Sequence, residues 1–125
     1  MATILVVEDN PDNMTLAVLL LKSAGHTVLS AADAEVGLTL ARTEQPDLIL
    51  MDIQLPGIDG LEATALLKLD EATRTIPVIA LTALAMKGDE ERIRAAGCDG
   101  YIAKPMGIHE FLAAVAARLS RPRES

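Results

Sequence analysis

The 125-residue chain is poor in aromatic side chains, cysteine and positive charge. Aromatic residues make up 2% of it and Trp is absent, so it lacks the aromatic faces on which single-stranded nucleic acids stack. Lys and Arg number 11 against 18 Asp and Glu, and the net charge of −7 is the opposite of a basic DNA-binding stripe. The composition therefore argues against nucleic acid as a partner.

Long hydrophobic segments are missing as well. The unbroken apolar runs are short, with six residues at Leu16–Leu21 and seven at Phe111–Ala117, whereas a bilayer-spanning helix needs about 20. Glu8 and Asp9 interrupt the N-terminal stretch too early for a signal peptide. The single Cys98 has no internal disulfide partner and is expected to be a small buried hydrophobe. We expect a cytoplasmic protein without membrane insertion.

Half of the residues are apolar, which is enough for one aliphatic core. Short apolar runs, expected to be buried strands, occur at Ile4–Val7, Thr27–Ser30, Leu48–Met51, Pro77–Leu81 and Gly100–Ala103. Segments with helical spacing separate or follow them, at Asp12–Ala24, Ala34–Glu44, Asp59–Leu69, Lys87–Ala96 and Gly107–Leu119. Strict alternation of strand and helix predicts an α/β domain, with a parallel sheet covered by helices on both faces.

The first expected helix has an ambiguous surface. Its polar residues Thr15 and Lys22 lie on one face, which predicts a core stripe on the opposite face, made of Asn13, Leu16, Ala17, Leu20 and Ala24. Met14, Val18 and Leu19 then flank the solvent side. They are either scattered exposed apolar residues or part of a partner surface. Gly25 and Gly97 follow expected helices at the position that favours a left-handed residue.

Polar side chains follow four of the expected strands. Glu8 and Asp9 come after the first, Asp52 after the third, Thr82 after the fourth and Lys104 after the fifth. Ligands bind at the carboxyl ends of the strands in open α/β sheets, so these groups are expected to converge. Three carboxylates in one place repel each other unless a cation lies among them, and oxygen-only ligands suit Mg²⁺.

Such a site would suit phosphoryl chemistry. A carboxylate beside Mg²⁺ can attack phosphorus, while Thr82 and Lys104 could contact the phosphate oxygens. Each residue alone has an ordinary explanation, because an Asp at a strand end is usually a turn former and a Lys-Pro is usually a surface loop. Their joint placement at one edge of the sheet favours the functional interpretation.

The motifs that carry these residues resemble the receiver domain of two-component response regulators. The matching segments are Ile4–Asn10, Leu48–Gly57, Gly60, Val78–Ala83, Gly97–Tyr101 and Ala103–Pro105. Two further stretches, Met51–Pro56 and Ala85–Arg94, resemble single-domain receivers of the DivK type in particular. The resemblance implies a flavodoxin-like (CheY-like), doubly wound, five-stranded parallel sheet of order 2-1-3-4-5. It also implies a receiver domain over residues 1–121, a short polar tail over 122–125 and no output domain.

The resemblance further assigns roles to individual residues. Asp52 would be the phosphoacceptor, and Thr82 and Lys104 would contact the phosphoryl oxygens. Mg²⁺, or Mn²⁺ in its place, would be held by Glu8, Asp9, Asp52 and the backbone carbonyl of Gln54. Tyr101 would turn inward as a switch when Thr82 moves, although a half-buried tyrosine on an edge strand is also an ordinary amphipathic residue. The Lys104–Pro105 bond would be cis.

The implied function is signalling rather than ordinary enzyme turnover. The chain would take a phosphoryl group from a histidine kinase or a histidine phosphotransferase and act through contacts with a downstream protein target. Phosphotransfer and autodephosphorylation at Asp52 would be its own Mg²⁺-dependent chemistry. The sequence names neither the kinase nor the target, and it leaves dimerisation open.

Two other functions use similar folds. A phosphohydrolase with an aspartyl nucleophile would want a second acid two residues after Asp52, where this chain has Gln54, and would turn over a phosphomonoester. A flavin or nucleotide carrier would need a small, hydroxyl-rich phosphate loop after the first strand, where Glu8 and Asp9 would repel a phosphate. A yellow purified protein would favour the carrier.

The expected docking patch for the phosphodonor consists of Asn13, Met14 and Ala17, with Pro105 and Met106 beside the site. Alanine or charged substitutions at Met14 and Met106 should slow phosphotransfer from the partner, because they remove apolar contact area from the patch. Transfer rates from a phosphorylated donor provide the measurement. Unchanged rates in both variants would contradict the docking patch.

Overall fold

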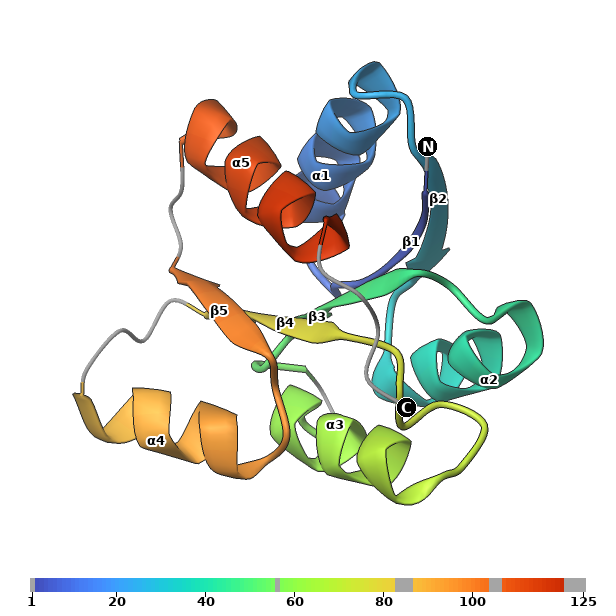
Figure 1. Ribbon diagram of the computed structural model, residues 1–125, viewed down its shortest axis with the longest axis vertical. Helices are drawn as coiled ribbons and strands as arrows, with labels where there is room; N and C mark the ends of the chain where they lie inside the picture. The colour runs from blue at the N-terminus through green and yellow to red at the C-terminus, as the bar shows by residue number, and fades with distance from the viewer. Residues whose placement is uncertain (1, 56, 83–86, 104–106, 121–125) are drawn as a thin grey trace.

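The computed structural model describes residues 2–55, 57–82, 87–103 and 107–120, which form a parallel sheet between two layers of helices (Figure 1). The strands are β1 (Thr3–Val7), β2 (Thr27–Ala31), β3 (Leu48–Asp52), β4 (Val78–Thr82) and β5 (Gly100–Ala103). The helices are α1 (Pro11–Ser23), α2 (Ala34–Glu44), α3 (Gly60–Leu69), α4 (Lys87–Ala95) and α5 (Ile108–Leu119). The strand order is β2-β1-β3-β4-β5, which confirms the expected fold and sheet order.

Four strands extend one residue beyond their expected bounds, since β1 begins at Thr3 and β2 ends at Ala31, and the other two differences concern the site. β3 includes Asp52, and β4 begins at Val78 rather than Pro77 and includes Thr82. Asp52 pairs with Leu81, the residue before Thr82, across the parallel ladder. Asp52 and Thr82 are therefore the last residues of adjacent strands rather than the first residues of the loops that follow.

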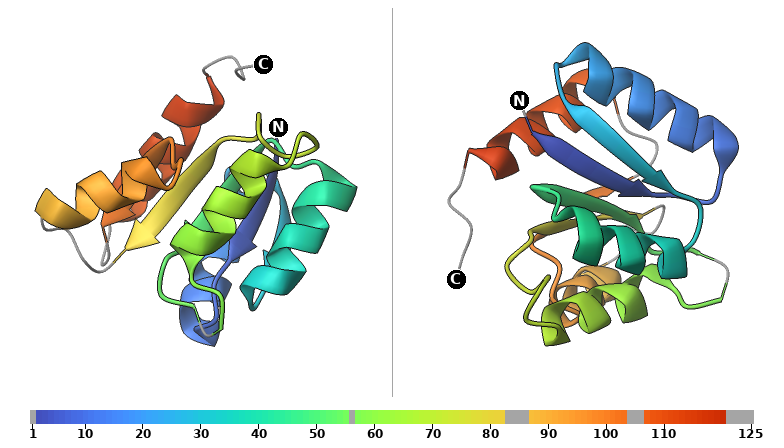
Figure 2. Two further views of the ribbon diagram at one scale, coloured as in Figure 1. Left: turned by 90° about the horizontal axis from the view of Figure 1, so that it is seen from below. Right: turned by 90° about the vertical axis from the view of Figure 1, so that its right-hand side faces the viewer.

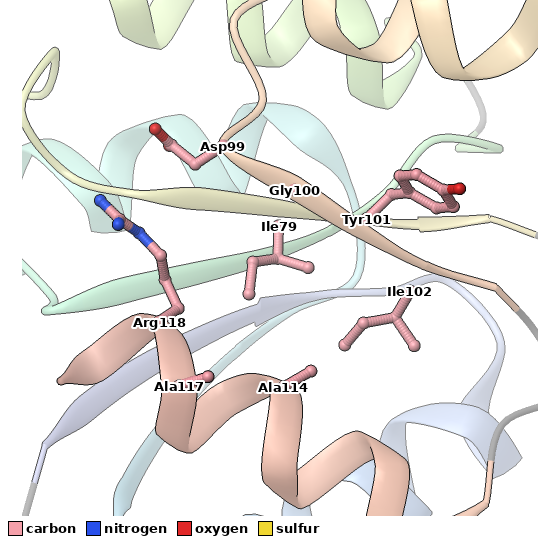
Figure 3. Close-up of a pocket in the computed structure, with 8 residues that line it drawn as sticks. All are labelled: Ile79, Asp99, Gly100, Tyr101, Ile102, Ala114, Ala117 and Arg118. Atoms are coloured by element: carbon pink, nitrogen blue, oxygen red, sulfur yellow. The ribbon is translucent and has the colours of Figure 1, made fainter. Parts of the chain in front are cut away.

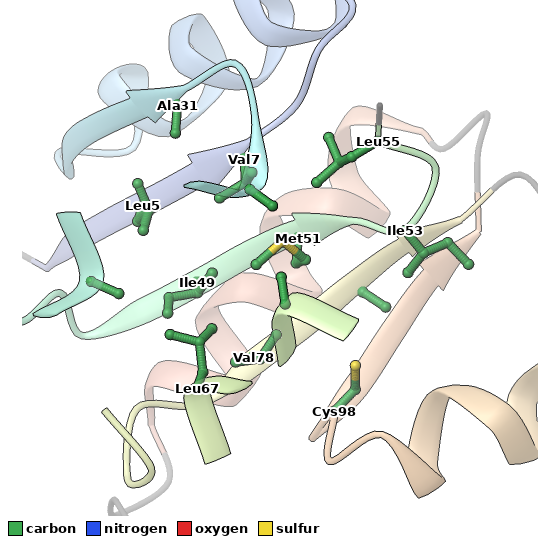
Figure 4. Close-up of a cluster of buried hydrophobic side chains, with 14 of the residues drawn as sticks. Leu5, Val7, Ala31, Ile49, Met51, Ile53, Leu55, Leu67, Val78 and Cys98 are labelled. Carbon is green, nitrogen blue, oxygen red and sulfur yellow. The ribbon is translucent and has the colours of Figure 1, made fainter. Parts of the chain in front are cut away.

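Side chains of the central strands alternate between two buried layers. In β1, Ile4 and Val6 belong to the core beneath α1 and α5, whereas Leu5 and Val7 belong to the core beneath the other three helices. Figure 4 shows part of this second core, and Figures 1 and 2 show α1 and α5 on the face opposite α2, α3 and α4. Since β-strand side chains alternate with a period of two, burial on both faces explains the continuous apolar run.

The predicted core stripe of α1 is partly wrong. The buried residues of this helix are Ala17 and Leu21, whereas Asn13, Leu16 and Ala24 are exposed, and Leu16 is 51% exposed. Met14 and Leu20 are partly buried against the same core. Residues 16–21 are all apolar, so their pattern marks no clear core face, and packing decides which residues are buried.

The helix ends agree with the turn chemistry of the sequence. The Asn10 side chain accepts hydrogen bonds from the amides of Asp12 and Asn13, at 2.9 and 3.0 Å, so α1 begins at Pro11 rather than Asp12. Gly25 and Gly97 have φ values of 92° and 103°, which confirms their predicted left-handed conformation. In the described part of the chain, no helix has the length and apolarity to cross a membrane.

Cys98 lies in the core, as expected from the sequence. It is 7% exposed, and its thiol lies 3.8 Å from the Thr64 hydroxyl. Burial raises the pKa of the Cys98 thiol, so the group stays protonated at neutral pH. This residue therefore behaves as a small apolar side chain rather than a nucleophile.

Lys68 links two segments at the end of the sheet where β4 and β5 begin. Its ammonium donates to the carbonyls of Ile76 and Arg74, at 2.9 and 3.3 Å, and lies 3.3 Å from the Asp99 carboxylate. The same Asp99 oxygen accepts from the Val78 amide at 2.8 Å. One side chain from α3 thus joins the segment before β4 to the segment before β5.

Replacing Lys68 with Met should lower the free energy of unfolding by about 1–3 kcal/mol, because it removes the ammonium donor from two carbonyls and the paired positive charge from the Asp99 carboxylate. Equilibrium urea denaturation provides the measurement. Lys22→Met, on the exposed surface of α1, is the matched control and should change the free energy by less than about 0.5 kcal/mol. Equal effects of the two substitutions would contradict the structural role of Lys68.

Candidate functional site

The three expected carboxylates meet at the carboxyl ends of β1 and β3. Glu8 and Asp9 directly follow β1, and Asp52 ends β3, which pairs with β1 along Ile4–Val7. One carboxylate oxygen from each of the three residues lies within 4.8 Å of the other two. β1 has β2 on one side and β3 on the other, so the cluster lies at the point where the strand order reverses.

Burial strengthens the electrostatic repulsion between the carboxylates of this cluster. Glu8 and Asp52 are 3% and 4% exposed, whereas Asp9 is exposed at the mouth of the site. Charged carboxylates this close together repel each other, and the repulsion is poorly screened away from water. An oxygen-only ligand set that is open on one side fits a hard divalent cation that retains some of its waters. The arrangement therefore fits Mg²⁺.

Backbone amides hold the two buried carboxylates in place. The Asp52 Oδ1 atom accepts a hydrogen bond from the Gln54 amide at 2.9 Å. The Glu8 Oε2 atom accepts a hydrogen bond from the Asn10 amide at 3.4 Å. The Glu8 backbone N–H donates to the Ala31 carbonyl at 3.0 Å, which ties the end of β1 to the end of β2. Amides of the loops that follow β1 and β3 therefore orient the two buried carboxylates.

Gly60, the first residue of α3, lies against the backbone of Asp52. A Cβ atom added at Gly60 would lie 2.1 Å from the Asp52 carbonyl oxygen and 2.6 Å from the Ile53 Cα. The Gly60 amide donates to the Ile53 carbonyl at 3.3 Å, and the Asp59 side chain caps the helix by accepting from the Glu62 amide. Only glycine permits this approach, so Gly60 helps to fix the turn that follows Asp52.

The sequence did not indicate this role of Gly60. Glycine at the first position of a helix, after an Asp cap, is compatible with many local structures. The close approach depends on how α3 packs against the end of β3, which is a tertiary contact. The useful signal was weak: a small residue eight positions after the candidate nucleophile, at the start of a helix.

The remaining predicted site residues differ in how far the structure describes them. Thr82 is fully buried at the end of β4, next to the strand that carries Asp52. The Gln54 side chain is exposed, and the backbone N–H of this residue donates to the Asp52 carboxylate. Lys104, Pro105 and Met106 lie outside the described residues.

Tyr101 is partly buried on β5 and packs against the core beneath α2, α3 and α4. Its hydroxyl lies 3.5 Å from the Glu90 carboxylate of α4, and Arg94 pairs with the same carboxylate at 3.3 Å. Glu90 was not predicted as a partner of Tyr101, because no local pattern joins residues of a helix to the strand after it. Tyr101 therefore links β5 to α4.

The predicted docking patch on α1 is only partly available at the surface. Asn13 is exposed and Met14 is partly buried, whereas Ala17 is 9% exposed and belongs to the core. Ala17 therefore offers little area to a partner. Leu16 and Leu19, 51% and 63% exposed, provide more apolar surface on the same helix.

Residues 4–116 match the family described as the response regulator receiver domain. The chain belongs to this family. It is 50% identical over 117 residues to the polar-differentiation response regulator DivK of Brucella ovis. The aligned region covers 94% of this chain and 95% of DivK. A receiver domain of this kind is a response regulator component of two-component signal transduction, which confirms the family indicated by the sequence motifs.

Solved structures of receiver domains share the fold. A putative response regulator from Chloroflexus aurantiacus superposes with a TM-score of 0.91 at 32% identity, covering 96% of this chain and 98% of that one. The receiver domain of the sensor histidine kinase PA1611 from Pseudomonas aeruginosa gives 0.89 at 38% identity, with the same coverage. That protein has a magnesium ion coordinated in its active-site cleft.

Replacing Gly60 with Ala should lower the free energy of unfolding by about 1–3 kcal/mol, because the new methyl group overlaps the Asp52 carbonyl. It should also weaken Mg²⁺ binding, since the backbone of Asp52 must move. Urea denaturation and a magnesium titration followed by NMR provide the two measurements. Gly100→Ala, where no atom lies within 4 Å of the added Cβ, is the control. A Gly60 variant that behaves like the control would show that the approach is not restrictive.

Proposed function

We propose that Asp52 of this receiver domain accepts a phosphoryl group from a phosphohistidine on a histidine kinase or a histidine phosphotransferase. The observation that supports the proposal is the meeting of Glu8, Asp9 and Asp52 within 4.8 Å at the point where the strand order reverses. Asp52 is central in this arrangement because it ends the middle strand of the sheet. The cytoplasmic location expected from the sequence is part of the same proposal.

The transfer needs no reactant besides the phosphohistidine and a proton from solvent. A carboxylate oxygen of Asp52 forms a bond to phosphorus while the phosphorus–nitrogen bond of the donor breaks. The imidazole leaves with the electron pair of that bond and takes up a proton. Autodephosphorylation is the attack of water on the same phosphorus, which releases inorganic phosphate and regenerates the carboxylate.

The residues around Asp52 have distinct parts in this proposal. The Gln54 amide orients the carboxylate, and Glu8 and Asp9 would hold Mg²⁺ together with Asp52 and the Gln54 carbonyl. Bound Mg²⁺, or Mn²⁺, supplies positive charge that offsets the incoming phosphoryl oxygens. Thr82 ends the neighbouring strand and, with Lys104, would contact those oxygens.

The output of the proposed reaction is a change in the surface that partners contact. Phosphorylation adds charge and strong acceptor oxygens next to Thr82. A displacement of Thr82 would favour a different position of Tyr101, whose hydroxyl lies near Glu90 of α4. The population of the active form rises only by the difference in contact energy between the two forms. A downstream protein target would read this shift.

Incubation with Mg²⁺ and a small phosphodonor such as acetyl phosphate should add the mass of one phosphoryl group to the protein, and Asp52→Asn should abolish the adduct. Intact-mass spectrometry provides the measurement. Asp47→Asn, an exposed position at the other end of β3, is the matched control and should be phosphorylated normally.

Chelation of Mg²⁺ before the phosphodonor is added should prevent formation of the adduct, and Asp9→Asn should reduce it. An adduct that persists in Asp52→Asn would show that another residue is the phosphoacceptor. An adduct that forms at the same rate with the metal chelated would show that the acidic cluster does not act through a cation.

A further inference from the structure

A cavity of about 150 Å³ lies between β5 and α5, at the edge of the sheet (Figure 3). Its apolar wall consists of Ile79, Ile102, Ala114 and Ala117. The two alanines leave room beside the isoleucines, and an apolar cavity of about 150 Å³ holds a benzene-sized group. The cavity therefore has space for one large aliphatic side chain from another molecule.

Arg118, from the last turn of α5, forms the polar end of this cavity. Its Nε atom is buried and has no hydrogen-bond partner, and it is the only such side-chain atom in the described part of the chain. A buried donor without an acceptor costs free energy that an incoming acceptor recovers. A carboxylate that binds Nε and one terminal nitrogen of the guanidinium would supply two acceptors at once.

The charges around the cavity favour an anion. Asp99 lies across the cavity from Arg118 (Figure 3), but one of its oxygens already accepts from the Lys68 ammonium and the Val78 amide. Asp99 and Lys68 offset each other, so the charge of Arg118 is in excess there. This positive charge is local, because the chain as a whole has a net charge of −7.

The cavity is separate from the phosphorylation site. Gly100, at the start of β5, pairs with Ile79 near the start of β4, whereas Asp52 and Thr82 are at the ends of their strands. The sheet thus has its acidic cluster at one end and this cavity near the other. Binding in this cavity does not require phosphorylation of Asp52.

We propose that the cavity between β5 and α5 binds a partner protein through a peptide segment in which a large aliphatic residue is followed by an acidic residue. The aliphatic side chain fills the space beside Ala114 and Ala117. The carboxylate pairs with the Arg118 guanidinium. Charge complementarity and the unsatisfied Nε together select an acidic segment over a neutral or basic one.

Two blocked dipeptides test the proposal on the full chain: acetyl-Leu-Glu-amide and its neutral match, acetyl-Leu-Gln-amide. In ¹H–¹⁵N correlation spectra, the acidic dipeptide should give saturable shifts at the amides of Gly100 and Ile102 and at the Arg118 Nε–H. The neutral dipeptide should bind at least about tenfold more weakly than the acidic one, because it lacks the charged acceptor.

Substitutions assign the effect to one guanidinium. Arg118→Gln should remove the preference for the acidic dipeptide and leave phosphorylation of Asp52 unchanged. Arg94→Gln, an exposed arginine on α4, is the matched control and should bind as the unsubstituted protein does. Spectra that otherwise superpose show that each variant is folded.

Several results would overturn the proposal. The first is equal binding of the two dipeptides, and the second is undiminished binding to Arg118→Gln. The third is the absence of any saturable shift. Binding of benzoate without binding of the acidic dipeptide would show a site for small carboxylates instead of a peptide site.

Discussion

The repulsion between carboxylates at one end of the sheet is the constraint on which the rest of this structure depends. Glu8 and Asp52 are almost fully buried, and Asp9 lies beside them at the surface. Two apolar layers hold the strands that carry these groups, and backbone amides fix their orientation. The free energy of the aliphatic core thus maintains a concentration of negative charge that would disperse in an unfolded chain.

Much of the fold was predictable because strand and helix patterns alternate strictly along the chain. The central strands β1, β3 and β4 are apolar at four consecutive positions out of five, and this continuous run indicates burial on both faces. The acidic cluster was predictable for a related reason, since the carboxyl ends of parallel strands meet at one edge. Here local sequence and global topology give the same answer.

The parts that sequence could not give depend on packing between distant elements. The face of α1 that enters the core was misassigned because Leu16–Leu21 is apolar all around the helix. The approach of Gly60 to Asp52, the pairing of Tyr101 with Glu90 and the unsatisfied Nε of Arg118 each join two elements. No periodicity in the chain encodes such contacts, so only the assembled structure shows them.

The Lys68 contacts restrict how β4 can respond to events at Asp52. The amide of Val78, the first residue of the strand, donates a hydrogen bond to the Asp99 carboxylate. Lys68 joins this carboxylate to the segment before the strand. These contacts hold β4 at the residue where it begins. The displacement of Thr82 proposed above would therefore bend the strand rather than shift it along its axis. Loss of the Lys68 contacts would let the whole strand shift along its axis, so that the effect of phosphorylation would reach both ends of the sheet.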